Sequence, residues 1–500
     1  MEELSPDAPK KKFGIQIIFI LYGVASLLGW NALLTKLDFF IYFLEGMKPS
    51  TSFSFLNFIL NIFFQFLLII KKDLFPLKFQ LLAGIIGSIL FLIGIPTSTM
   101  LLPKDSVINY MVTGGLVTLM GFINALASGG FFNFVSYFPL DLIVAFSAGQ
   151  GFSGITMNVL EYLVLFLAPG KEEHLIVLRA WIFFGVSALI LVLCLILVLY
   201  NYNSEYTRYY LSKGNKSEIP EGSLVDRDTL MNEEEQGIVS EPGNSKEENK
   251  NAQKEEGNNN SFKMFFFIFK KIWDLDLLMA YIYIVTFALF PNASIGQNLF
   301  NLGDYNSNTV IIIYNIGDTI GRYLVNLMPR TKLVNNIICI NRSFLLFTLV
   351  FNWYMQDALE LDLTLTSIFL ILNVAILALT NGIGTTLCFG IAPNEVEDEY
   401  KGLAGTSLSF FLIVGIFLGS CINFGVDAII SLFKKSIEDN GQRASIISIT
   451  ISTFLRFSFI SRRARAIWPG YHSIFISLLK DVPDLAFYIG PFDIANIRKS

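Results

Sequence analysis

Long apolar stretches recur along this sequence, separated by short polar connections. A helix needs about 20 mostly apolar residues to cross the hydrocarbon core of a bilayer. Charged residues make up 15% of the chain, well below the roughly 25% of ordinary soluble domains, which points to a membrane protein. The sequence therefore predicts an all-α polytopic membrane protein with 11 transmembrane helices. The stretches that meet the length requirement lie at about residues 13–35, 52–70, 77–97, 109–135, 141–168, 178–200, 271–291, 307–328, 335–355, 363–391 and 403–433.

A long polar segment divides these stretches into a group of six and a group of five. Residues 201–265 are rich in Glu, Asn, Lys and Ser and lack apolar periodicity, so they do not bury enough surface to fold on their own. We expect a disordered connector between the helices of residues 13–200 and those of residues 266–433. Residues 1–12 form a short N-terminal segment. For residues 434–500 we expect a C-terminal extension, and the sequence leaves open whether it crosses the membrane a twelfth time.

Basic residues at the ends of the apolar stretches indicate the side of the membrane that each connection occupies. Lys and Arg favour the cytoplasmic side, and three basic groups fall on alternate connections. The pattern predicts a cytoplasmic N-terminus and a cytoplasmic segment 201–265, where cytoplasmic partners would bind. We expect the plasma membrane as the host membrane. The basic groups are Lys10 to Lys12, then Lys71, Lys72 and Lys78, then Arg330 and Lys332.

Motifs of soluble catalysis and of cofactor binding are not recognisable in the sequence. It has no P-loop, no H-E-x-x-H and no plausible nucleophile triad. The four cysteines lie in apolar stretches without C-x-x-C spacing, and two histidines, His174 and His472, are too few for a His-based metal site. We expect no enzyme activity, no cofactor, no metal and no nucleic-acid partner. The expected partners are a small-molecule solute and the lipid bilayer.

Two opposite charges, Asp318 and Arg322, lie inside the eighth apolar stretch. Four residues apart on a helix, they share one face. An unpaired charge at the centre of a bilayer costs about 2.5 to 3.5 kcal/mol on insertion scales, and pairing lowers this cost. Ionisable residues at this depth usually face a bundle interior or a watery cavity and mark a transport path. A transport path is our leading interpretation, and a structural brace between helices is the alternative.

Trp30 and Asn31 lie deep in the first apolar stretch, whereas a tryptophan of the interfacial aromatic belt lies near a membrane surface. An indole offers a flat stacking surface and one N–H donor, and an amide offers both a donor and an acceptor. This pair suits a planar, hydrogen-bonding solute. Packing between helices is the alternative for Trp30 and the favoured role for Asn31.

Small residues indicate where helices approach closely or bend. Gly149, Gly151 and Gly154 match G-x-G-x-x-G, but they open a long apolar helix and no strand precedes them, so we interpret them as a packing face rather than a nucleotide site. Asn381 and Gly382 interrupt the tenth stretch, and kinks of this kind let helices bend during gating.

The order of several motifs resembles the equilibrative nucleoside transporter family over roughly residues 13–433. The first stretch carries LGWN, and the eighth carries DxxGR at Asp318 to Arg322. The further matches are the NxxxxGG tract that begins at Asn124, GQGFSG at 149–154, TFALFP at 286–291, Arg342, the Asn-Gly pair at 381–382, and GLAGT at 402–406.

This resemblance implies a major-facilitator-like bundle in a 6+5 arrangement that carries nucleosides, and sometimes nucleobases, by alternating access. It implies that Leu27 and Trp30 contact the solute, and that Asp318 and Arg322 engage the ribose hydroxyls and the base. Ser128 stands where many members have a glutamine, which leaves the choice between nucleosides and nucleobases open. The residues we assign to gating or packing are Asn31, Gly149, Gly154, Arg342, Asn381 and Gly382.

Two alternatives remain beside facilitative nucleoside transport. The first is a proton-coupled carrier of nucleobases or small cations in which Asp318 or Glu161 titrates, although for Glu161 we favour an acid that snorkels or faces a loop. The second is a non-transporting membrane receptor or scaffold whose segment 201–265 recruits partners.

Overall fold

The computed structural model describes residues 14–44, 49–71, 74–170, 172–215, 245–290, 294, 297–357 and 362–440. These residues form helices and their connections and contain no β-strand, so the all-α prediction is confirmed for them. The chain divides into two units, residues 1–424 and residues 425–500. Within the second unit, only the end of the last helix belongs to the described residues.

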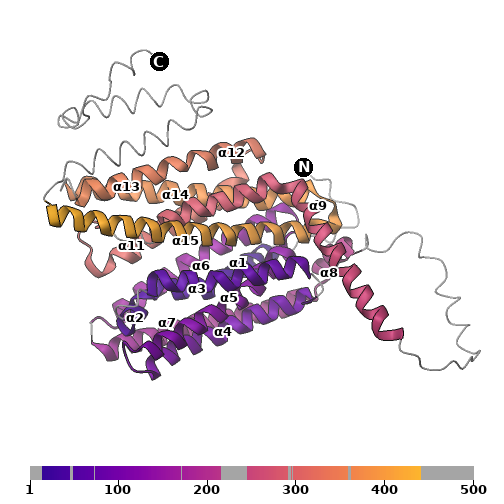
Figure 1. Ribbon diagram of the computed structural model, residues 1–500, viewed down its shortest axis with the longest axis horizontal. Coiled ribbons are helices and arrows are strands. Elements are labelled where there is room, and N and C mark those ends of the chain that lie inside the picture. The colour runs from indigo at the N-terminus through magenta and orange to yellow at the C-terminus, as the bar shows by residue number, and fades with distance from the viewer. Residues whose placement is uncertain are drawn as a thin grey trace, which may run out of the picture. The chain divides into compact units, whose positions relative to one another are not determined.

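The helices of the first group pack side by side (Figure 1). Several begin at residues that suit a helix N-terminus: Pro76 and Pro139 precede two of them, and the side chain of Ser106 accepts a hydrogen bond from the backbone N–H of Asn109. The bounds are α1 Gly14–Thr35, α2 Leu37–Phe43, α3 Pro49–Ile70, α4 Leu77–Leu101, α5 Val107–Val135, α6 Leu140–Leu167, α7 Glu173–Tyr202 and α8 Glu205–Asn215.

The helices of the second group pack against one another and, through α11 and α6, against the first group (Figure 1). The ninth expected span, residues 335–355, is not one continuous helix. It is interrupted at Arg342, between α12 and α13. The bounds are α9 Ser245–Leu289, η3 Gly303–Tyr305, α11 Asn306–Leu324, η4 Val325–Leu327, α12 Lys332–Asn341, α13 Ser343–Asp357, α14 Leu363–Ile391, η5 Ala392–Glu395, η6 Asp398–Tyr400 and α15 Lys401–Asn440.

Helices occupy all eleven ranges expected to span the membrane, but not all of them meet the criteria for a span. Among the described residues, nine helices are long and apolar enough to cross a bilayer: α1, α3, α4, α5, α6, α7, α9, α14 and α15. Helix α11 falls short because it carries Asp318, Arg322 and several asparagines. Helices α12 and α13 are each too short alone. The count of eleven therefore stays a prediction.

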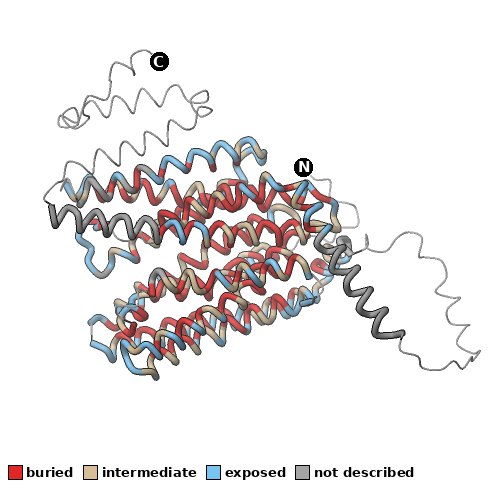
Figure 2. Tube along the Cα trace, viewed as in Figure 1, coloured by how far each residue is buried: buried red, intermediate tan, exposed pale blue. Residues whose placement is uncertain are grey.

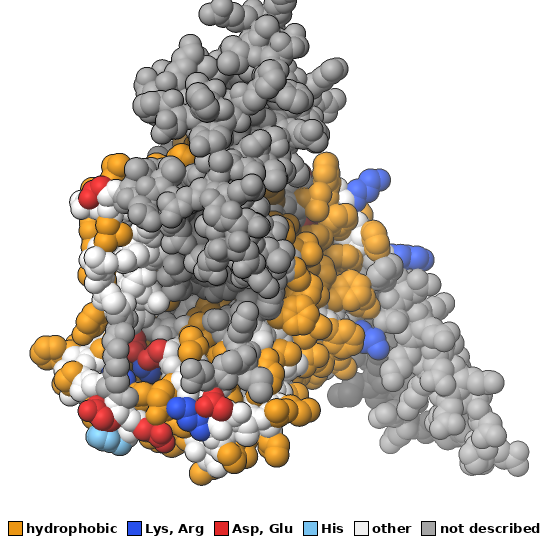
Figure 3. Space-filling view, turned by 60° about the vertical axis from the view of Figure 1, so that its left-hand side comes forward, with side chains coloured by type: hydrophobic (Ala, Val, Ile, Leu, Met, Phe, Trp, Pro, Cys, Tyr) orange, Lys and Arg blue, Asp and Glu red, His pale blue; other side chains and the backbone are white. Residues whose placement is uncertain are grey.

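The surface of the bundle fits a lipid environment. Figure 2 shows buried positions on the helix faces turned toward neighbouring helices and exposed positions on outward faces. Figure 3 shows a broad hydrophobic flank with charged side chains at its borders. On α7, for example, Leu189, Leu193 and Ile196 are more than half exposed, which suits side chains in contact with acyl chains.

The segment expected to be disordered contains helix at both of its ends. Helix α8 lies within it, and α9 begins at Ser245. The rings of Tyr206 and Tyr210 on α8 lie 6.3 and 5.3 Å from the ring of Phe138, in the connection between α5 and α6. Aromatic packing on the end of the bundle explains why a polar sequence forms this helix. Residues 1–13, 216–244 and 441–500 lie outside the described residues, so the predictions for them remain predictions.

Candidate functional site

Helices of both groups enclose a cavity in the middle of the bundle. Its volume is about 150 Å³, counted as the space open to the centre of a water molecule. Side chains from α1, α3, α5 and α6 line it from the first group, and side chains from α9, α11, α14 and α15 line it from the second. All five residues predicted to bind the solute are among the lining residues: Leu27, Trp30, Ser128, Asp318 and Arg322.

Asp318 and Arg322 form a buried ion pair on α11. The Nε of Arg322 donates to Oδ2 of Asp318 at 2.8 Å, as the spacing of four residues allows. The Nδ2 of Asn381, on α14, donates to the other carboxylate oxygen at 2.8 Å. Each carboxylate oxygen has two lone pairs, so each retains capacity for a further donor from a solute.

Arg322 also joins α11 to the first group of helices. Its Nη1 donates to the carbonyl oxygen of Ser147 at 3.0 Å and to Oε1 of Gln150 at 3.0 Å, both on α6. The Nε2 of Gln150 in turn donates to Oγ of Ser26 on α1 at 3.3 Å. Gln150 was not among the site residues predicted from the sequence. The only signal was one long amide inside the glycine-rich GQGFSG.

A second arginine lies behind this ion pair. Arg342 is fully buried, and its Nη2 donates to Oγ1 of Thr286 and, at 3.4 Å, to the carbonyl oxygen of Leu377. Thr286 donates to Oδ1 of Asn381 at 2.8 Å, which connects Arg342 to Asp318 through two side chains. The region around Asp318 therefore holds two guanidinium groups and one carboxylate. Asn381 itself lines the cavity, so its place is at the site and not only at a packing contact.

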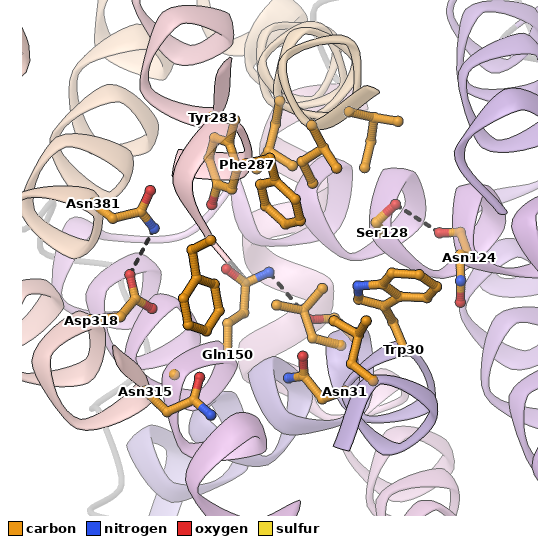
Figure 4. Close-up of a pocket in the computed structure, with 18 of the residues that line it drawn as sticks. Trp30, Asn31, Asn124, Ser128, Gln150, Tyr283, Phe287, Asn315, Asp318 and Asn381 are labelled. Carbon is orange, nitrogen blue, oxygen red and sulfur yellow. Dashed lines mark hydrogen bonds between the residues drawn. The ribbon is translucent and has the colours of Figure 1, made fainter. Parts of the chain in front are cut away.

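Trp30 lies at the opposite side of the cavity from Asp318 and Asn381 (Figure 4). Its ring meets the ring of Phe58, on α3, edge to face, with centroids 4.9 Å apart. The neighbouring Asn31 lines the cavity and donates to Oγ of Ser153 on α6 at 3.0 Å. The cavity thus places a carboxylate and a guanidinium group opposite an indole ring, which suits a solute with one hydroxyl-rich part and one planar part.

The glycines assigned to packing lie where helix backbones touch. A Cβ on Gly149 would collide with the carbonyl oxygen of Ile20 on α1, and one on Gly154 would collide with the side chain of Asn315 on α11. A Cβ on Gly382 would collide with the carbonyl oxygen of Asp318. These contacts bring α1, α6, α11 and α14 close enough for the side chains of the site to meet.

Glu161 is not the snorkelling or loop-facing acid that we favoured from the sequence. It is 1% exposed, and its Oε1 accepts a hydrogen bond from Nζ of Lys36 at 2.7 Å, with Lys36 itself fully buried. The expectation failed because Lys36 follows α1 directly, and only the packing of α1 on α6 brings it to Glu161. Among the residues the structure describes, no group of His, Cys, Asp and Glu side chains is arranged to hold a metal ion.

The arrangement of two helix groups around a central polar cavity defines a class by its fold, the helical bundles of the major facilitator type. The fold matches that of XylE, a proton:xylose symporter of the major facilitator superfamily, with a TM-score of 0.58, 13% sequence identity, and coverage of 85% of this chain and 90% of that one. A partially occluded, inward-open structure of the E. coli xylose transporter XylE gives a TM-score of 0.51 at 14% identity, over 84% of this chain and 98% of that one. At these identities the likeness concerns the fold alone.

The family follows from the sequence. The model of the nucleoside transporter family matches residues 114–428, more than half of the chain, and the chain belongs to this family. Equilibrative nucleotide transporter 4 of Arabidopsis thaliana is 25% identical, over 84% of this chain and 95% of its own length. Human equilibrative nucleoside transporter 2 is 23% identical, over 84% of this chain and 98% of its own. The resemblance read from the motifs is thereby confirmed.

Proposed function

We propose that this protein carries nucleosides across a membrane by facilitative transport with alternating access. Its family, the names of its relatives and the fold of its structural neighbours all support this function. The observation that carries the proposal is the cavity between the two helix groups, with a buried ion pair at one end and a tryptophan at the other.

In the proposed binding mode, the carboxylate of Asp318 accepts hydrogen bonds from two ribose hydroxyls. Arg322 donates to acceptor atoms of the solute, and the excess of guanidinium groups over carboxylates in this region favours a solute rich in acceptors. Trp30 and Leu27 contact the planar base, and Ser128 lies at the same end of the cavity. A neutral, polar solute loses hydrogen bonds to water when it enters the cavity, and the hydrogen bonds to the protein compensate for this loss.

The same contacts supply a mechanism for alternating access. Arg322 joins α11 to Ser147 and Gln150 on α6, and these two helices belong to different groups. A rocking motion of one helix group against the other changes these hydrogen bonds. Arg322 then exchanges its partners on α6 for the solute, or the solute for its partners on α6. A solute shifts the equilibrium between the inward-open and outward-open states only if its affinity for the two states differs. Arg322 provides such a difference if it binds the solute in one state and the opposite helix group in the other.

The orientation and the location belong to the same proposal. The basic residues at the helix ends support a cytoplasmic N-terminus and a cytoplasmic segment 201–265, and we propose the plasma membrane as the site of transport. Partner proteins in the cytoplasm would meet the protein at that segment.

Uptake measurements test this function directly. Radiolabelled adenosine, inosine and hypoxanthine are supplied to cells that lack their own nucleoside transport and express this protein. We expect saturable adenosine uptake, and we expect Asp318→Ala to reduce it at least tenfold at matched surface expression. Glu397→Gln, at an exposed carboxylate outside the cavity, is the control. Normal uptake by the Asp318→Ala variant would refute the binding mode.

Proton coupling is a second candidate, favoured by one observation. Asp276, on α9, is fully buried and accepts from Oγ of Ser407 at 2.9 Å, while its Oδ1 has no partner and no cation pairs with it among the described residues. A buried carboxylate without a cationic partner is costly in an apolar environment, which makes Asp276 a candidate carrier of a transported proton. Asp318 and Glu161 both have cationic partners and fit this role less well. Two results would support proton coupling. A protonophore would abolish uptake by the wild-type protein, and uptake by the Asp276→Asn variant would no longer depend on pH.

A further inference from the structure

One face of helix α11 carries three polar side chains at intervals of four residues. Tyr314, Asp318 and Arg322 lie one helical turn apart, and all three line the cavity. Asp318 and Arg322 are held by their ion pair. Tyr314 is a lining residue that the sequence motifs did not indicate. Its contacts show what this third side chain offers to a solute.

The ring of Tyr314 is held in place by aromatic packing. It stacks on the ring of Phe290, directly after α9, with the ring centroids 4.1 Å apart and the planes 12° from parallel. Both rings belong to a buried cluster of the second helix group, and Tyr314 is 9% exposed. Packing therefore fixes the position of the phenol group, so little further ordering is needed when a solute binds.

The hydroxyl of Tyr314 is open, in contrast to its polar neighbours on α11. It makes no hydrogen bond within the described part of the chain, and it is not one of the polar atoms sealed from solvent there. The neighbouring Asn315 donates to Oδ1 of Asn158 at 2.6 Å, and Asp318 accepts two hydrogen bonds from protein groups. A phenol hydroxyl can both donate and accept. Tyr314 thus adds an open donor and acceptor to the wall that carries Asp318.

The chemistry of ribose supplies a partner for this hydroxyl. A ribonucleoside has hydroxyl groups on C2′, C3′ and C5′. In the proposed binding mode Asp318 accepts from two of them, and the two on neighbouring carbons, C2′ and C3′, suit a single carboxylate. The 5′-hydroxyl remains, and it is attached through C4′ beside the carbon that bears the 3′-hydroxyl. It needs a partner next to Asp318, because it loses its hydrogen bonds to water in the cavity.

We propose that Tyr314 determines specificity by forming a hydrogen bond with the 5′-hydroxyl of a nucleoside whose 2′ and 3′ hydroxyls are bound by Asp318. This inference rests on the proposed nucleoside transport, and it names the preferred class: ribonucleosides with a free 5′-hydroxyl. A solute without this group leaves the hydroxyl of Tyr314 unpaired in the occupied cavity. The site discriminates against such a solute for that reason.

The test compares adenosine with 5′-deoxyadenosine, which lacks only the 5′-hydroxyl. The ratio of their uptake efficiencies therefore isolates this one contact. We expect the wild-type protein to prefer adenosine by roughly tenfold, the worth of one hydrogen bond together with the penalty for an unpaired hydroxyl. Tyr314→Phe keeps the ring that stacks on Phe290 and removes only the oxygen. In this variant adenosine uptake falls toward that of 5′-deoxyadenosine, whose own uptake is maintained.

Tyr323→Phe is the matched control, because it makes the same change on the same helix at a tyrosine outside the cavity lining. Tyr323 is 39% exposed and packs edge to face on Phe152, so its variant leaves the ratio unchanged. A wild-type ratio near one overturns the inference, whether or not the Tyr314→Phe variant reaches the cell surface. A preference that persists in Tyr314→Phe overturns it too, while adenosine transport itself stands. A wild-type protein that transports neither solute overturns the proposed function instead.

Discussion

Arg322 shows how much of the site depends on the shape of one side chain. Its guanidinium group donates to Asp318 through Nε and to Ser147 and Gln150 through Nη1. One planar group therefore makes hydrogen bonds to three residues. A lysine keeps the charge but offers a single ammonium on a flexible stem, which does not reproduce this geometry.

We therefore expect Arg322→Lys to lower nucleoside uptake at least tenfold, even though the charge is conserved. The measurement is the initial rate of adenosine uptake, normalised to the amount of protein at the cell surface. Arg330→Lys is the control, because Arg330 is exposed at the end of the eighth expected span. If Arg322→Lys transported at the wild-type rate, charge alone would suffice at this position and the bridging role would be wrong.

At the scale of helices, the site depends on close crossings. Gly382 on α14 and Gly321 on α11 both lie against backbone atoms of the other helix, so the two backbones approach within reach of Asn381 and Asp318. By contrast, a Cβ on Gly94 of α4 would meet nothing within 4 Å. The two kinds of glycine predict opposite effects of the same substitution.

We expect Gly382→Ala to destabilise the folded protein by about 1 to 3 kcal/mol, because the added methyl group pushes α11 away from α14. Gly94→Ala is expected to raise stability by up to about 1 kcal/mol, since alanine favours a helix more than glycine does. Thermal unfolding of the purified protein in detergent measures both. Equal stability of the two variants would contradict the close crossing.

An ion pair joins α9 to the connection between α14 and α15. Nζ of Lys271 lies 2.7 Å from Oε1 of Glu397, and this hydrogen bond lowers the pKa of the exposed Glu397 carboxyl below its usual 4.5. A carboxyl with a lowered pKa in the folded state stabilises the fold above its unfolded pKa, and the contribution is lost as the pH falls through the folded value.

The small loss of thermal stability in Glu397→Gln should therefore appear at pH 7 and vanish as the pH falls through the lowered pKa of the folded wild-type carboxyl, which is then protonated and as neutral as the glutamine. High salt should reduce the difference at pH 7, because the pair is exposed to solvent. Melting temperatures across a pH series, with and without added salt, provide the measurement. A difference that persisted at low pH would mean that the substitution acts through something other than the ion pair.

At the scale of the whole molecule, the described residues that line the cavity belong to the two helix groups. We expect the segment 216–244 to connect these groups without taking part in transport. A carrier and a scaffold therefore respond differently when the sequence of the segment is changed.

Replacement of residues 216–244 by a Gly/Ser segment of equal length should leave the initial rate of adenosine uptake within about twofold of wild type, because the length needed to connect the two helix groups is preserved. Uptake and surface expression are measured together. Loss of uptake at normal surface expression would favour the receptor or scaffold alternative, in which this segment carries the function.

The helices and the ion pair were predictable because both are local. Runs of apolar residues specify where helices form in a membrane, and Asp318 and Arg322 meet through a spacing of four residues. The break at Arg342 was not predictable in the same way, since residues 332–357 contain neither glycine nor proline to indicate the end of a helix. There the N–H of Arg342 and that of Leu345 each bond three residues back, a turn that hydropathy does not reveal.

The sequence by itself determined the helical membrane class, the family motifs and the local charge pair. Only the tertiary structure decided that Gln150 meets Arg322 across 172 residues, that Lys36 meets Glu161 across 125, and that Asn61 lines the cavity. The physical reason is that a helix period states which residues share a face, whereas the partner of that face depends on how helices distant in the chain pack together.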